Sequence, residues 1–200
     1  AHTAVDKAES EPDLAFAINA AAPKTFAEEA AKIGAVAIHF STDYVFDGSK
    51  ETGYVESDPV GPLNVYGRSK LAGEVALGAS GAAYFVFRTS WVYGATGKNF
   101  VRSMLKFARE RDHLRIVGDQ RGSPTWSFEL AKITALVIRQ IEQRAAQVGK
   151  YLPDAALPLS GIYHASGGGG GRRDGFCLQA LAGCAKTVAG GEGPHGGGIF

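Results

Sequence analysis

The sequence contains only two cysteines, Cys177 and Cys184, among its 200 residues. Their spacing matches neither a zinc site nor a redox pair, so we expect free thiols and no disulfide framework. Residues 1–7 do not show the basic stretch followed by an apolar stretch that marks a secretion signal. These absences predict a cytoplasmic protein.

Long apolar runs and charge clusters are missing as well. No window approaches the roughly 18 consecutive apolar residues that a membrane-spanning helix needs. The 21 basic and 20 acidic residues nearly cancel, and neither sign forms a long run. Charge therefore gives no indication of a nucleic-acid partner or a membrane surface.

The sequence does have enough apolar residues to form a hydrophobic core, since they make up 45% of the chain. Apolar residues recur at helical spacing after Pro12, and Gly34 is expected to end this helix, with Pro23 as a candidate for a kink. The apolar run over residues 35–40 follows without alternation, which is typical of a parallel strand covered on both faces.

The rest of the chain continues this alternation of helices and strands. We expect strands over residues 83–88, 114–117 and 161–164, and helices from Tyr66 to Leu77, from Phe100 to Phe107, and from a cap at Ser127 to Ile141. Such alternation predicts a parallel α/β sheet, in which ligands bind beyond the carboxyl ends of the strands.

Polar side chains begin where two of these strands end. Ser41, Thr42 and Asp43 follow the first strand, and Thr89-Ser90-Trp91 follows the second. A solvated strand end is the simpler explanation. Because the carboxyl ends of parallel strands meet at one edge, the alternative is that these residues form the wall of a ligand site.

Tyr66 and Lys70 are spaced four residues apart, so a helix would place them on one face, one turn from each other. A phenol has a pKa near 10, and a neighbouring ammonium lowers that pKa toward the working range. The pair is thus a candidate proton donor for a carbonyl that is reduced. The spacing alone is weak evidence, because it occurs by chance in many helices.

Six short sequence motifs narrow the interpretation of the fold and the function. They are STDYVFDG (41–48), YGRSKLAGE (66–74), RTSWVYG (88–94), NFVRSML (99–105), GDQRGSPT (118–125) and GIYHASG (161–167). In this order and at similar separations they resemble the dTDP-4-dehydrorhamnose reductases of the extended short-chain dehydrogenase type, over about residues 1–166. The resemblance implies a Rossmann-like, doubly wound parallel sheet. It also implies hydride transfer from NADH or NADPH to C4 of dTDP-6-deoxy-L-lyxo-4-hexulose, which yields dTDP-L-rhamnose.

The resemblance also assigns roles to residues. Tyr66 would protonate the C4 oxygen, Lys70 would hold the nicotinamide ribose, and Thr42 would hydrogen-bond the reacting carbonyl. Asp43 would contact the sugar, and Trp91 would pack against it.

Four further positions receive an interpretation from the resemblance or from their place in the chain. Ala1 and His2 would align with a segment that approaches the cofactor, where His2 replaces a tyrosine of the family. We interpret Asn19 as a packing or backbone-bonded residue, and His39 as a core histidine. The resemblance leaves Mg²⁺ open as a further cofactor, because the residues do not reveal one.

Two alternatives remain open. A sugar-nucleotide epimerase or dehydratase is one, although the related dehydratases follow the threonine with Asp-Glu, and here Tyr44 follows Asp43. A non-catalytic regulatory subunit of the methionine adenosyltransferase type is the other, since it is built on the same fold. Such a subunit has no need to keep Thr42, Tyr66, Lys70 and Trp91 together.

The glycine-rich strand-to-helix turn of a dinucleotide site is absent from the start of the chain. We therefore expect a fragment with little or no activity. Residues 1–112 would be the end of the NAD(P)-binding Rossmann domain, and 113–166 the start of an incomplete substrate domain plus a helix that packs back on the first. Residues 167–200 would be an aberrant tail, expected to be mostly unstructured because 14 of the 27 glycines fall in the last forty residues. The intact protein is expected to be a homodimer with a dTDP-sugar as substrate.

Overall fold

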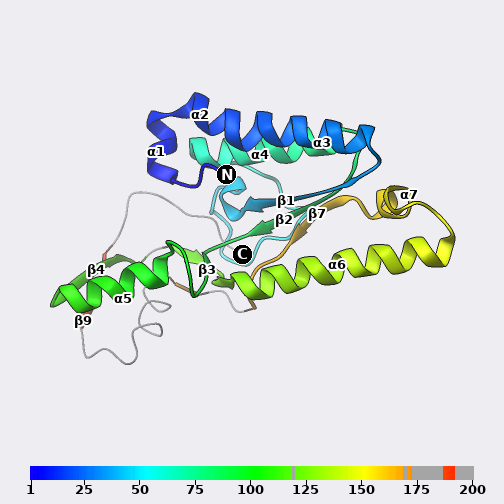
Figure 1. The fold of residues 1–200 in the computed structure, drawn as a ribbon. Coiled ribbons are helices and arrows are strands. Elements are labelled where there is room, and N and C mark those ends of the chain that lie inside the picture. Colours follow the sequence, from blue (N-terminus) through cyan, green and yellow to red (C-terminus); the bar gives the residue numbers. More distant parts are fainter. Residues whose placement is uncertain (119, 169–170, 173–186, 192–200) are drawn as a thin grey trace.

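The computed structural model describes residues 1–118, 120–168, 171–172 and 187–191. A parallel sheet lies at its centre (Figure 1). The strands, in order across the sheet, are β1 (Val36–Thr42), β2 (Ala83–Thr89) and β7 (Gly161–His164). Val36 lies opposite Ala83 and Thr42 lies opposite Thr89, so the carboxyl ends of β1 and β2 coincide. The predicted α/β class with a parallel sheet is confirmed.

One layer of helices covers the upper face of the sheet in Figure 1. It consists of α1 (Val5–Ser10), α2 (Pro12–Phe16), the π-helical segment η1 (Ala17–Ala21), α3 (Ala22–Lys32) and α4 (Val65–Ala79). Apolar side chains seal this face, with Ala27 and Ala30 of α3 and Leu77 of α4 packed against Val86 of β2. This layer brings α4, which carries Tyr66 and Lys70, next to β1.

The predicted long helix after Pro12 forms with one irregularity. Gly34 ends it at a φ of 65°, as expected. Pro23 does not break the helix, but it has no N–H to donate to the Asn19 carbonyl, and the wider π turn lies just before it. The freed carbonyl faces Gly73 of α4 so closely that a Cβ there would overlap it. The absence of a side chain at Gly73 therefore permits the close approach of the two helices at this point.

The lower face of the sheet is covered by α6 (Ser127–Val148), with α7 (Leu152–Ala156) and the short turn η3 (Leu157–Leu159) at one end (Figure 1). Leu130 and Ile141 of α6 pack against Phe85 and Phe87 of β2. Ser127 does not cap this helix as predicted. Trp126 occupies the cap position without a side-chain bond, because it is still part of a short strand.

Shorter elements lie beyond the carboxyl edge of the sheet. They are η2 (Asp43–Val45), β3 (Val92–Tyr93), α5 (Phe100–Glu110), β4 (His113–Val117), β5 (Arg121–Gly122), β6 (Thr125–Trp126), β8 (Gly171–Arg172) and β9 (Thr187–Gly191). Strand β3 pairs with β6, β4 with β9, and β5 with β8. Met104 and Leu105 of α5 pack against Leu114 and Ile116 of β4.

The glycine-rich end differs in part from the expectation of little structure. The structure describes residues 167–168, 171–172 and 187–191 of it, and the last two segments are strands whose backbones pair with β5 and β4. Backbone pairing needs no apolar side chains, which is why composition did not reveal it. Cys177 and Cys184 lie outside the described residues. Among the helices that the structure describes, none has the length and apolar character to cross a membrane.

Candidate active site

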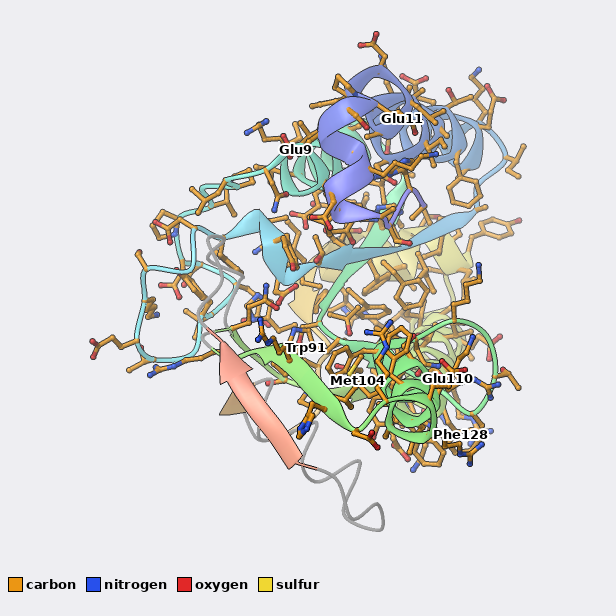
Figure 2. All side chains as sticks on the ribbon, turned by 90° about the vertical axis from the view of Figure 1, so that its left-hand side faces the viewer. Glu9, Glu11, Trp91, Met104, Glu110 and Phe128 are labelled. Carbon is orange, nitrogen blue, oxygen red and sulfur yellow. The ribbon has the colours of Figure 1, made fainter. Side chains whose placement is uncertain are left out.

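A cavity of about 490 Å³ opens at the carboxyl ends of β1 and β2. Its lining includes Ala1, Thr42, Asp43, Tyr66, Lys70 and Trp91. Figure 2 views the molecule from the left-hand side of Figure 1, and Trp91 is labelled there below the pale-blue ribbon of β1. The structure therefore brings together, around one space, all but one of the residues to which the resemblance assigns a place in the site. The exception is His2.

Thr42 and Asp43 are positioned by the end of β1. The Thr42 hydroxyl donates to Oδ1 of Asp43 over 3.0 Å and accepts from the backbone N–H of Tyr44 over 3.3 Å. Both residues are buried, and within the described part of the chain Oδ2 of Asp43 has no hydrogen-bond partner. Burial raises the pKa of Asp43 to about 7, against the opposing effect of the Thr42 hydrogen bond. A carboxyl group that is half protonated near neutral pH thus lies in the wall of the cavity.

Tyr66 lies in the first turn of α4, which Asn64 caps by accepting from Gly67 N–H over 2.7 Å. Its ring packs edge-on against Tyr44, and 9% of the residue is exposed. Burial raises the pKa of Tyr66 to about 12, and the neighbouring Thr42 hydroxyl only partly opposes this. The expectation that Lys70 lowers the pKa of this phenol is therefore wrong for this structure. Tyr66 stays protonated at neutral pH, which is the state that a proton donor needs.

Lys70 has its own hydrogen-bond partners in β1. Its Nζ lies 3.2 Å from Nε2 of His39 and donates to the Phe40 carbonyl over 2.5 Å. Burial lowers the pKa of Lys70 to about 8, opposed by the charge of Glu74. Burial, together with the charge of Lys70, lowers the pKa of His39 to about 4, so its imidazole is neutral at physiological pH.

His39 is thus more than the core histidine that we expected. Sequence reasoning missed its contact with Lys70, although one signal was available. His39 is the one strongly polar residue inside the apolar run 35–40.

Asn19 is backbone-bonded, as predicted. Its Oδ1 accepts from the N–H of His2 over 2.8 Å, and its Nδ2 donates to the carbonyl of His2 over 3.0 Å and to Ser69 Oγ over 3.0 Å. These bonds hold the start of the chain against α4, so that Ala1 lines the cavity. The imidazole of His2 instead contacts Glu11, with Nε2 3.6 Å from Oε2.

A buried ion pair ties the two main elements of the site together. Arg88 of β2 donates to Glu74 of α4 over 2.7 Å, and their side chains are 3% and 1% exposed. Glu74 lies one helical turn after Lys70, and Arg88 lies one residue before the end of β2. The pair therefore fixes the register of α4 on the sheet.

Metal ligands are not assembled in the part of the chain that the structure describes. No group of three or more His, Cys, Asp or Glu side chains there could hold a metal ion. Mg²⁺ is left open as a further cofactor by the resemblance, and the residues themselves do not predict it.

Comparisons with known proteins agree with these features. The family model described as "RmlD substrate binding domain" matches residues 1–188, past Gly167, where we expected the resemblance to end. The dTDP-4-dehydrorhamnose reductase of Shigella flexneri is 47% identical over 169 residues, which are 84% of this chain and 52% of that protein. The chain thus spans about half the length of the curated relatives it matches.

Two solved structures extend the comparison to the fold. The crystal structure of a dTDP-4-dehydrorhamnose reductase from Clostridium acetobutylicum matches with a TM-score of 0.87 and 33% identity, over 100% of this chain and 69% of that chain. That of Bacillus anthracis, solved in complex with NADP, matches with a TM-score of 0.86, 33% identity and the same coverage.

Proposed function

Because this chain belongs to the RmlD family of dTDP-4-dehydrorhamnose reductases, we propose that the whole protein reduces the C4 keto group of dTDP-6-deoxy-L-lyxo-4-hexulose. The product is dTDP-L-rhamnose, and the reductant is NADH or NADPH. One observation carries the proposal, namely that Thr42, Tyr66 and Lys70 line one cavity at the carboxyl edge of a parallel sheet. The names of the matched relatives favour this activity over the regulatory-subunit alternative.

The residues around the cavity fit the nicotinamide end of the cofactor. Lys70 supplies a buried ammonium, and the first residues of the chain supply a backbone wall that Asn19 holds in position. When bound, NAD(P)H supplies the hydride. Lys70 would donate to the ribose hydroxyls with the N–H that remains beyond its bonds to His39 and Phe40.

Tyr66 would deliver the proton that the C4 oxygen takes up after hydride transfer. A phenol whose pKa is about 12 is fully protonated at neutral pH and still more acidic than an alcohol, so the transfer to an alkoxide is downhill. Thr42 would orient the carbonyl by donating to the same oxygen. For this its hydroxyl must turn away from Oδ1 of Asp43, or accept a hydrogen bond from a neutral Asp43 carboxyl group.

Asp43 and Trp91 would bind the sugar. The unbonded Oδ2 of Asp43 is available to a sugar hydroxyl, and the indole of Trp91 offers an apolar surface. A cofactor role for His2 is supported only through its backbone, because its ring contacts Glu11. The homodimer, the cytoplasmic location and the domain boundary near residue 112 stay predictions.

The test is an assay of the full-length protein with the 4-keto sugar nucleotide, following NADPH and NADH oxidation by absorbance and the product by mass spectrometry. A product two hydrogens heavier than the substrate supports reduction. A product that keeps its 4-keto group would favour an epimerase, and copurification with a methionine adenosyltransferase would favour the regulatory subunit. We expect little or no turnover by the 200-residue chain itself, because it lacks the glycine-rich pyrophosphate turn.

A further inference from the structure

The indole of Trp91 lies directly on the backbone of Gly122. A Cβ added at Gly122 would lie 2.7 Å from Cε2, 2.9 Å from Cζ2 and 2.9 Å from Nε1 of the indole. Carbon atoms do not approach this closely without a shift of one partner. Only a hydrogen atom fits between this backbone position and the ring.

The backbone of Gly122 does not itself require glycine. Its φ lies outside the left-handed region, unlike those of Gly97 at 72° and Gly149 at 63°. Glycine at such a position gains nothing from its conformational freedom. Position 122 therefore needs a residue without a side chain, because the indole of Trp91 occupies the space where a side chain would lie.

The backbone at Trp91 is held in place as well. Its φ is 44°, a conformation that bulky aromatic residues rarely adopt and that persists only when the surroundings enforce it. Ser90 Oγ donates to the Ser123 carbonyl over 2.6 Å and accepts from Ser123 N–H over 3.2 Å. Thr125 N–H donates to the Trp91 carbonyl over 3.3 Å. The loop after β2 is thus clamped to the segment that carries Gly122.

We propose that Gly122 is a positioning residue for sugar binding, which seats the Trp91 indole as the apolar wall of the cavity that Thr42, Tyr66 and Lys70 line. The sugar-binding part of this inference rests on the proposed function. A side chain at position 122 displaces the ring, which alters the wall that the sugar packs against. Lys70 and the Asn19-bound start of the chain are not displaced, so binding of the cofactor is unaffected.

The seating of the indole can be tested without activity. The sequence has two tryptophans, so Trp126→Phe leaves Trp91 as the single tryptophan, which is excited selectively, in the 200-residue chain. Gly122→Ala in that background should shift the emission maximum and change acrylamide quenching. Gly168→Ala is the matched control, because a Cβ there meets nothing within 4 Å. A folded Gly122→Ala chain with unchanged emission and quenching would refute the seating.

A double-mutant cycle covers the case in which Gly122→Ala fails to fold. Trp91→Ala removes the ring that the new methyl group would strike, so Gly122→Ala should cost far less melting temperature in that background than in the wild type. Circular dichroism gives the four melting curves. Equal losses in the two backgrounds, or unfolding in both, would overturn the proposal.

The consequence for binding is measured in the full-length enzyme. Gly122→Ala should raise the KM for the 4-keto sugar nucleotide by about tenfold, the scale of one misplaced apolar contact. The KM for NADPH should stay unchanged, and Gly168→Ala should alter neither constant. Equal rises in both KM values would contradict a role in sugar binding, even where the fluorescence shift is found. Absence of activity in the wild type would instead count against the proposed function alone.

Discussion

The Nζ of Lys70 lies 3.2 Å from the Nε2 of His39, which links α4 to the middle of β1 beside the cavity. A lysine ammonium has only donors, so Nε2 of His39 must accept, and the ring proton lies on Nδ1. The low pKa of His39, about 4, keeps the imidazole in this accepting state throughout the physiological range. With the Phe40 carbonyl, His39 thus fixes two of the three N–H directions of Lys70.

The first prediction concerns His39→Leu in the full-length protein. This variant leaves one donor of a buried ammonium without its acceptor, which costs about 1–3 kcal/mol and lets the lysine turn from its position. We expect the KM for NADPH to rise about tenfold, the equivalent of about 1.4 kcal/mol.

His39→Gln is the matched control, because the amide oxygen can still accept from Lys70. Steady-state kinetics at several pH values measures both variants. If the leucine variant binds NADPH as well as the wild type does, Lys70 does not depend on His39.

The second prediction concerns the pH dependence of stability at Asp43. Its pKa rises from the ordinary value of 3.8 to about 7 on folding, chiefly by burial. The unfolded chain therefore releases this proton more readily, and stability that is present below about pH 4 is lost as the pH rises to about 7. Asp43→Asn cannot ionise, so it should remove this loss, which is on the order of a few kcal/mol.

Thermal or urea unfolding of the 200-residue chain between pH 5 and pH 8 measures the effect. The wild type should lose stability across this window relative to Asp43→Asn, whereas the exposed Asp13→Asn should follow the wild type. Parallel curves for wild type and Asp43→Asn would mean that the carboxyl group is already ionised at pH 5.

Much of the arrangement of helices and strands was predictable from the sequence, because the spacing of apolar residues and the polar residues at strand ends are local properties. The run 35–40 gave a strand, the Tyr66–Lys70 spacing gave one helix face, and the carboxyl-edge rule brought Thr42 into the same cavity. These predictions depend on residues that are close in sequence or on a general rule for parallel sheets.

The sequence could not reveal pKa values that depend on burial, or contacts between residues that are distant in the sequence. The spacing of Tyr66 and Lys70 indicated that the lysine lowers the phenol pKa, but burial raises that pKa, and Lys70 contacts His39 of another element. The contact between the Trp91 indole and Gly122 joins residues 31 positions apart in the sequence. A glycine in a loop motif does not reveal which side chain packs against it. Ser127 is a residue type that often caps helices, but the helix begins at Ser127 itself, and Trp126 of the preceding strand occupies the cap position.

The third prediction concerns the buried pair of Arg88 and Glu74. Glu74→Gln removes the charge but keeps the shape, which leaves the Arg88 guanidinium uncompensated in a site where both side chains are at most 3% exposed. We expect a loss of about 3 kcal/mol in the free energy of unfolding of the 200-residue chain. Glu28→Gln is the control, because the ion pair of Glu28 with Lys24 is 3.8 Å long and largely exposed. This variant should change the free energy of unfolding by less than about 0.5 kcal/mol. Similar losses from both variants in urea titrations would show that Arg88 finds another partner.

The last prediction concerns the proton that Tyr66 is proposed to deliver. Tyr66→Phe keeps the ring that packs on Tyr44 and removes only the hydroxyl, so folding and cofactor binding should be kept while turnover of the full-length protein falls by about 100-fold or more. Fluorescence titration with NADPH separates binding from turnover, and Tyr84→Phe, near the start of β2, controls for the loss of a phenol as such. Because the hydroxyl is the only group removed, a Tyr66→Phe enzyme with the wild-type rate would mean that the C4 oxygen takes its proton from elsewhere. Asp43, with its pKa of about 7 and its unbonded oxygen at the cavity wall, would then be the next residue to test.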